Sequence, residues 1–234
     1  MAIELVTTDG IFALDGGEWE VTNNIWLVGD DREVIVFDAA HDAEAIAAGV
    51  NGRRVRAIVL THGHNDHINA AVPLREAVDA PIFLHPDDHM LWNVVWPEAD
   101  PDRQLEPGAA LHVAGHELGV LHTPGHSPGC CCFHDADSSV VLSGDTLFCG
   151  GPGATGRSYS DEPTILRSII TRLLTLPAET IVHTGHGEST TIGAERERVD
   201  LVGVHALSQA LLKISHQDRV IQAEACFDSQ ILRS

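Results

Sequence analysis

Four short apolar runs end in a glycine-flanked histidine or aspartate, and this shared ending constrains the fold more than any other feature of the sequence. Residues 55–60, 118–121, 140–142 and 180–182 lead into T-H-G-H, T-P-G-H, S-G-D and T-G-H. Runs of this length that are rich in Val, Ile and Leu are typical of buried strands. Glycine lets the chain turn sharply off a strand because it has no Cβ atom. The pattern predicts a sheet that delivers metal-type ligands from one end of its strands.

The rest of the chain predicts an α/β fold in one main domain. With 234 residues, of which 44% are hydrophobic, the chain can bury a substantial core. Further strands are expected at 21–28, 34–37, 82–84, 111–114 and 129–133, and helices at 42–49, 66–78, 162–176 and 194–212. We expect the domain to span residues 1–214. Residues 215–234 form a C-terminal extension, which is either a frayed end or a contact with another subunit of a homo-oligomer.

The densest cluster of ligand-type residues is T-H-G-H-N-D-H at 61–67. If the chain stays extended there, the alternation of His62, His64 and Asp66 sends three side chains to the same face, and His67 reaches a neighbouring point. Imidazole and carboxylate together suit zinc, iron or manganese, and three protein ligands per ion leave a position open for solvent. An open position predicts catalysis.

The motif H-x-H-x-D-H at 62–67, followed by His126, Asp145 and His186 in that order, resembles the metallo-β-lactamase superfamily. The resemblance covers roughly residues 5 to 192. It implies a four-layer αββα sandwich and two divalent metal ions, with zinc expected first and iron or manganese as alternatives. It also implies the ligands: His62, His64 and His126 for one ion, Asp66, His67 and His186 for the other, and Asp145 as the bridge between them.

The sequence around these ligands resembles that of the glyoxalase II branch, which hydrolyses thioesters. The matching segments are H-T-P-G-H-S-P-G from His122, S-G-D-T-L-F from Ser143 and the G-G pair at Gly150. Full-length glyoxalase II enzymes carry a helical C-terminal domain that binds glutathione, whereas only about 40 residues follow the last matching segment here. The whole chain is also similar to small actinobacterial hydrolases associated with mycothiol, which implies an acyl-mycothiol such as S-formylmycothiol as substrate.

Two further residues have counterparts in the glyoxalase II pattern. Arg157 and Tyr159 follow the Asp145 loop, where that branch has a basic residue and a tyrosine in contact with the thiol carrier. A guanidinium fork could hold a carboxylate of the substrate. The alternative interpretation is that both belong to a solvated loop.

A binuclear site predicts hydrolysis. Two ions about 3.5 to 4 Å apart lower the pKa of a shared water from near 16 toward 7, which makes hydroxide the expected nucleophile. Asp66 is a candidate catalytic residue that steers this hydroxide or accepts its proton. A leaving thiolate needs little help from an acid, which favours a thioester substrate. The alternatives are a mononuclear iron persulfide dioxygenase and a lactone or β-lactam hydrolase.

The composition limits which binding partners and which cellular compartment are expected. The 34 acidic and 14 basic residues give a net charge of −20, which repels nucleic acid, so a small-molecule substrate is expected instead. We see neither a signal peptide nor a run near the roughly 20 apolar residues of a membrane span. The five cysteines lack the spacing of a disulfide framework. We therefore expect a cytoplasmic protein without membrane contact.

Several polar residues keep two interpretations. Asp38, at the end of the strand expected at 34–37, either orients a metal ligand or forms a turn. Cys130, Cys131 and Cys132 alternate along a strand and are expected in the core. The remaining ten of the 15 histidines are left outside the site.

Overall fold

Two six-stranded sheets form the centre of the protein. The computed structural model describes residues 2–198. The first sheet contains, in spatial order, β1 (Ala2–Leu14), β2 (Gly17–Gly29), β3 (Glu33–Phe37), β4 (Arg54–Val59), β5 (Ile82–Leu84) and β6 (Arg103–Gln104). The second contains β14 (Thr190–Thr191), β13 (Ile181–Thr184), β10 (Val140–Gly144), β9 (Cys131–Asp135), β8 (His116–His122) and β7 (Ala110–Val113). A separate ribbon pairs β11 (Leu147–Phe148) with β12 (Gly151–Pro152).

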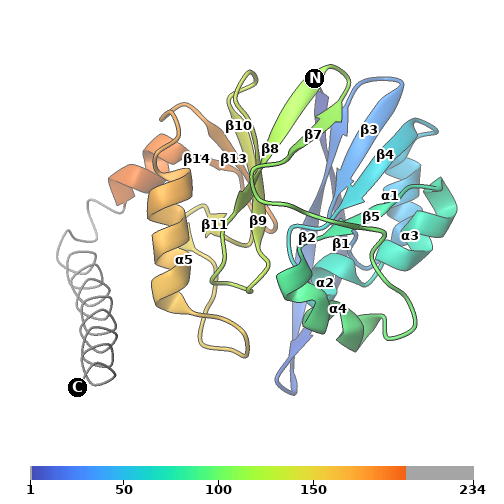
Figure 1. The fold of residues 1–234 in the computed structure, drawn as a ribbon, viewed down its shortest axis with the longest axis horizontal. Coiled ribbons are helices and arrows are strands. Elements are labelled where there is room, and N and C mark those ends of the chain that lie inside the picture. The colour runs from blue at the N-terminus through green and yellow to red at the C-terminus, as the bar shows by residue number, and fades with distance from the viewer. Residues whose placement is uncertain (1, 199–234) are drawn as a thin grey trace, which may run out of the picture. The chain divides into compact units, whose positions relative to one another are not determined.

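Helices cover the outer face of each sheet, so the protein has four layers (Figure 1). The helices on the first sheet are α1 (Ala43–Val50), α2 (Asn65–Ile68), α3 (Ala71–Val78) and α4 (His89–Val95), with a 3₁₀ turn at Pro86–Asp88. The second sheet is covered by α5 (Glu162–Ser168), which continues as a π-helical segment, Ile169–Leu173. The predicted α/β fold and its αββα layering are confirmed.

Each pair of neighbouring layers encloses an apolar core. Ile58, Ile46 and Leu74 belong to the core between the first sheet and its helices, and Ile165 and Val182 belong to the core beneath α5. Between the two sheets, Phe37 and Phe133 are almost fully buried, with ring centroids 4.9 Å apart. This middle core fixes the two sheets face to face, and therefore fixes the loops at their shared edge relative to one another.

Most predicted elements appear, with instructive exceptions. The helix expected over 66–78 is divided in two: α2 ends at Ile68, and α3 begins at Ala71. Strand β1 was not predicted, since its residues are largely exposed and show no buried run. The expected helix beyond residue 198 and the boundary at 214 lie outside the described residues.

The strands that precede the site end at a common edge. Strand β3 runs parallel to β4, and β10 runs parallel to β13, so within each sheet these strands finish on the same side.

Among residues 2–198, no helix is long and apolar enough to cross a membrane. The three consecutive cysteines, Cys130 to Cys132, are buried as expected.

We predict that Phe133→Ala lowers the free energy of unfolding by about 3–5 kcal/mol, because it leaves a cavity between the sheets. Urea denaturation followed by tryptophan fluorescence measures this loss. Phe133→Leu, which keeps most of the volume, should cost clearly less. Equal losses for the two variants would show that the middle core relaxes around the missing ring.

Candidate metal centre

Seven histidine and aspartate side chains meet at the shared edge of the two sheets. They are His62 and His64 after β4, Asp66 and His67 in α2, His126 after β8, Asp145 after β10 and His186 after β13. Six of them are buried, and the side chain of His186 is 23% exposed. The structure thus brings together every residue that the sequence suggested as a metal ligand.

The local backbone separates the dense motif into two parts. The extended alternation expected over His62, His64 and Asp66 continues only to His64, which is the N-cap of α2. The helix begins at Asn65 and turns Asp66 and His67 toward a second point. The extended backbone expected through Asp66 is therefore wrong after His64, because a helical turn replaces it, although His64 and Asp66 line the same cavity.

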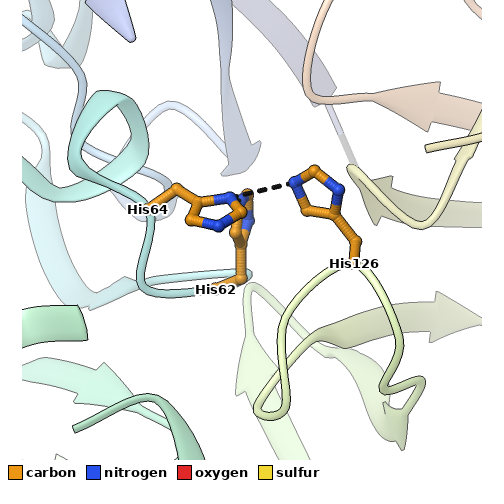
Figure 2. Close-up of side chains that lie close together, drawn as sticks. All are labelled: His62, His64 and His126. Carbon is orange, nitrogen blue, oxygen red and sulfur yellow. Dashed lines mark hydrogen bonds between the residues drawn. The ribbon is translucent and has the colours of Figure 1, made fainter. Parts of the chain in front are cut away.

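His62, His64 and His126 form the first half-site (Figure 2). Nδ1 of His64 lies 3.0 Å from Nε2 of His62 and 3.0 Å from Nε2 of His126. A tetrahedral ion with metal–nitrogen bonds of about 2.0–2.1 Å separates its ligands by about 3.3 Å. These two separations are therefore already close to the spacing that one ion imposes, and all three nitrogens lie within 4.8 Å of one another.

Asp66, His67 and His186 form the second half-site. Nε2 of His67 and Nε2 of His186 are 3.2 Å apart, and each lies 3.4–3.5 Å from Oδ2 of Asp66. Asp145 stands between the half-sites. Its Oδ2 is 3.5 Å from Nε2 of His126 and 3.4 Å from Nε2 of His186. One carboxylate thus reaches ligands of both half-sites, as a bridge must.

Buried atoms without partners show that this donor set fits cations. Oδ1 of Asp66 and Oδ1 of Asp145 are buried and have no hydrogen-bond partner among residues 2–198. A buried carboxylate oxygen left in this state is costly unless a cation neutralises it. Imidazole nitrogens and carboxylate oxygens are the ligands of borderline divalent metals. The residues therefore fit two divalent ions, one in each half-site.

The two half-sites differ in their electrostatics. Burial opposes charge on His186, but Asp145 and Asp66 outweigh it and raise its pKa to about 10. Burial is outweighed in the same way at His67, whose pKa lies well above the ordinary value because of Asp145, Asp66 and Asp38. In the first half-site, burial and neighbouring His126 lower the pKa of His64 to about 3. Without metal, protons on the second half-site neutralise the carboxylates that a cation would otherwise neutralise.

Asp38 orients a ligand of the second half-site. Of the two roles considered for it, orienting a metal ligand or forming a turn, the structure supports the first. Its Oδ2 lies 2.9 Å from Nδ1 of His67. The same carboxylate accepts hydrogen bonds from the backbone N–H of Thr61 at 2.7 Å and from its hydroxyl at 3.0 Å. Asp38 therefore holds His67 so that Nε2 faces the site.

Asp88 supports the first half-site and was not found from the sequence. It is fully buried and accepts hydrogen bonds from the backbone N–H of Gly63 at 2.7 Å, from that of Gly129 at 2.6 Å and from the hydroxyl of Ser127 at 2.6 Å. These bonds join the loop of His62 to the loop of His126. Asp88 belongs to no recognisable motif, so the sequence offered no signal for it.

The half-sites open into a cavity of about 570 Å³, a size that suits a small organic ligand. One wall is the hairpin of β1 and β2, which contributes Phe12 and Trp19. The segment after β11 contributes Cys149, Ala154 and Arg157 to the same lining. The ligand groups lie in the same lining, so a molecule in the cavity reaches both metal positions.

Of the two residues suggested as substrate contacts, Arg157 and Tyr159, only Arg157 lines the cavity. Arg157 lines the cavity, and its guanidinium carbon lies 3.7 Å from the ring centroid of Trp19. Tyr159 is 55% exposed and is absent from the lining. Its backbone has φ of 68° in a turn closed by the hydrogen bond from Ser160 N–H to the Arg157 carbonyl, and the structure gives no support to its suggested contact.

A further cluster, His85, Asp87 and His122, is a poor metal site despite its composition. The rings of His85 and His122 are stacked 4.2 Å apart with an interplanar angle of 11°. Imidazole lone pairs lie in the ring plane, so parallel rings cannot direct them at one ion. Both histidines stay outside the site, as the sequence suggested.

The chain belongs to the metallo-beta-lactamase superfamily, whose family model matches residues 19–186. Among its relatives is hydroxyacylglutathione hydrolase GloC of Haemophilus influenzae, which is 32% identical over 74% of this chain and 87% of its own length. The probable metallo-hydrolase YqgX of Bacillus subtilis is 34% identical over 75% of this chain and 90% of its own length. The predicted family and its glyoxalase II-like branch are thereby confirmed.

Two solved structures with a similar fold agree with this family assignment. TTHA1623 in a di-iron-bound form is similar with a TM-score of 0.66 and 38% identity, covering 76% of this chain and 94% of that chain. The B3 metallo-beta-lactamase BLEG-1 is similar with a TM-score of 0.69 and 32% identity, covering 81% of this chain and 97% of that chain. The fold is that of dinuclear metallo-hydrolases.

We predict that Asp145→Ala reduces the metal content of the purified protein from two ions to one or none, because it removes the bridge. Inductively coupled plasma mass spectrometry measures the ions per chain, and circular dichroism checks the fold. Asp135→Ala is the matched control, since Asp135 is equally buried but bonds to Ser138 and His116. Two ions in Asp145→Ala would contradict the bridging role.

We also predict that metal uptake releases about one to two protons per chain at pH 7. The pKa of His186 is about 10 and that of His67 is raised well above its ordinary value, so both rings hold protons that an ion must displace. Apparent metal affinity should therefore rise with pH across the neutral range. Calorimetric titration in buffers with different protonation enthalpies counts the protons, and heats that do not depend on the buffer would rule out this coupling.

Proposed function

We propose that this protein is a binuclear metal-dependent thioesterase that cleaves an acylated low-molecular-weight thiol, with zinc as the metal that best suits the ligand set. The carrying observation is the pair of half-sites, bridged by Asp145, in the lining of a cavity large enough for such a substrate. The similarity to GloC, described as a hydroxyacylglutathione hydrolase, supports the substrate class. The di-iron form of TTHA1623 makes iron the main alternative metal.

Bound divalent ions would supply activated water and polarise the substrate carbonyl. The chain itself supplies position and proton transfer. Asp66 lines the cavity and keeps one carboxylate oxygen without a hydrogen-bond partner among the described residues, which suits it to orient the attacking water or accept its proton. A departing thiolate has a pKa near 8.5 and leaves without a general acid.

Arg157 is our candidate for binding the thiol carrier. Its guanidinium lies over Trp19 and within 5.3 Å of the ring centroid of Phe12, and no carboxylate of residues 2–198 pairs with it within 4.0 Å. Aromatic stacking restrains the side chain while its N–H groups remain able to bind an anion. This supports a carrier with a carboxylate or phosphate group.

The second candidate function is hydrolysis of a β-lactam, which the similarity to the B3 metallo-beta-lactamase BLEG-1 favours. It would use the same two half-sites on a cyclic carbonyl. We place the thioesterase first because the leaving group of a lactam is a nitrogen that must be protonated. We further propose a cytoplasmic location, since the cysteine pattern suits a reducing compartment.

The decisive substrate experiment is a panel of acyl thioesters of glutathione, mycothiol and coenzyme A, with a lactone and a β-lactam, assayed on zinc-loaded protein. We expect at least one thioester to be hydrolysed about 100-fold more efficiently than either cyclic substrate, as measured by release of free thiol or loss of ring absorbance. One iron per chain with persulfide-dependent oxygen consumption would refute the hydrolase and identify a dioxygenase.

We predict that Arg157→Gln raises KM for the preferred thioester about 10- to 100-fold with little change in kcat, because a charge-assisted hydrogen bond contributes about 1.5–3 kcal/mol. Arg167→Gln is the matched control, since Arg167 lies on α5 and is not part of the cavity lining. An unchanged KM in Arg157→Gln would exclude this residue from carrier binding.

A further inference from the structure

Asn23 occupies a fourth corner beside the second half-site. It is fully buried on β2, and its Nδ2 lies 3.2 Å from Oδ2 of Asp66, 3.3 Å from Nε2 of His67 and 3.5 Å from Nε2 of His186. The three ligand atoms are themselves 3.2–3.5 Å from one another. Nδ2 of Asn23 is therefore in contact with all three ligand atoms of this half-site, although Asn23 belongs to no motif found in the sequence.

A chain of hydrogen bonds determines which end of the Asn23 amide faces the ligands. The backbone N–H of His41 donates to Oδ1 of Asn69 at 2.6 Å, so Nδ2 of Asn69 is the group that faces Nδ1 of His41 at 3.0 Å. Nδ1 of His41 must then accept, which puts the ring proton on Nε2. Nε2 of His41 lies 2.9 Å from Oδ1 of Asn23 and donates to it. The NH₂ group of Asn23 is consequently turned toward the second half-site.

The surroundings of His41 hold this arrangement in place. Gly10 of β1 lies so close to the ring of His41 that a Cβ atom at position 10 would collide with its Nδ1. The backbone of His41 has φ of 60°, a conformation that non-glycine residues rarely adopt. Burial lowers the pKa of His41, which favours the neutral ring that the hydrogen-bond chain requires. The close approach of Gly10 and the backbone conformation of His41 together fix the position of its ring.

An amide NH₂ cannot ligate a cation, so its effect is exerted through Asp66. It donates to Oδ2, the Asp66 oxygen that lies near both histidine nitrogens, and holds that oxygen in the ligating position. Within the described residues, the contacts of Asn23 with the seven ligand residues all go to the second half-site. The first half-site has its own support in Asp88.

We propose that Asn23, oriented by His41 and Asn69, is a positioning residue that sets the metal affinity of the second half-site independently of the first. The proposal rests on the metal centre of the proposed function, but not on the identity of the substrate. It assigns a role to two residues, Asn23 and His41, that the sequence left unassigned.

The test is a metal titration of the metal-free protein against a chromophoric zinc chelator, which resolves the two binding steps without measuring activity. We expect Asn23→Ala to weaken one step about 10- to 100-fold and to leave the other unchanged, the usual size of an effect on a ligand's hydrogen-bond partner. Thr8→Val is the matched control. Thr8 is the cross-strand partner of Asn23 and is equally buried, but its hydroxyl bonds to the Ala40 carbonyl.

His41→Phe provides a second variant that keeps a ring in the same space. It should weaken the same step as Asn23→Ala, and the double variant should bind no more weakly than Asn23→Ala alone, because both residues act through one hydrogen bond. Equal weakening of the two steps, additive effects, or unchanged binding in Asn23→Ala would overturn the proposal. Fewer than two steps in the unmodified protein would instead contradict the binuclear centre itself.

Discussion

The burial of Asp66 and Asp145 among five imidazole rings is the constraint on which the rest of the structure depends. Two carboxylates removed from water are tolerated only with nearby positive charge. In the metal-free protein, raised pKa values at His67 and His186 let protons provide that charge, and both His67 and His186 lower the pKa of Asp145 well below its ordinary value. A divalent ion in each half-site would displace these protons and supply the positive charge in their place.

The fold supplies this concentration of ligands through its strand ends. Two sheets that pack face to face bring the ends of β4, β8, β10 and β13 to one edge, and short loops cover the remaining distance. Position 185 shows how tight the arrangement is, because a Cβ atom added to Gly185 would meet Oδ1 of Asp145 and the ring of His67. Each half-site also has its own buried carboxylate behind it, Asp88 for the first and Asp38 for the second. The supports of the two half-sites meet at Asp145 and again at Thr61, whose hydroxyl lies 3.0 Å from Oδ2 of Asp38 and 3.0 Å from Nδ1 of His62.

The sequence was informative where chemistry and periodicity coincide in one segment. Apolar runs followed by glycine and a ligand residue indicated the strands together with His62, His64, His126, Asp145 and His186, since each signal is local. Asp66 and His67 came from the dense cluster at 61–67, and the family resemblance implied how the seven ligands are divided. Asn23, His41 and Asp88 could not be found in this way. Their roles depend on partners that lie from 18 to 163 residues away in the chain, and nothing in the neighbouring residues distinguishes them from polar residues of the surface.

Two other differences between the sequence-based predictions and the structure also have physical causes. Strand β1 is an edge strand with mostly exposed side chains, so it lacks the apolar run by which the other strands were recognised. The suggested role of Tyr159 came from the resemblance to the glyoxalase II pattern, and a single left-handed residue in a loop is enough to change where a side chain lies. Loops are the part of this protein that sequence patterns constrain least.

Anomalous X-ray diffraction from crystals of the zinc-loaded protein, recorded on both sides of the zinc absorption edge, tests the central claim most directly. Two peaks about 3.5–4 Å apart are expected. One should be surrounded by the nitrogens of His62, His64 and His126, the other by Asp66, His67 and His186, with Asp145 between them. A single peak, or peaks elsewhere on the protein, would contradict this claim.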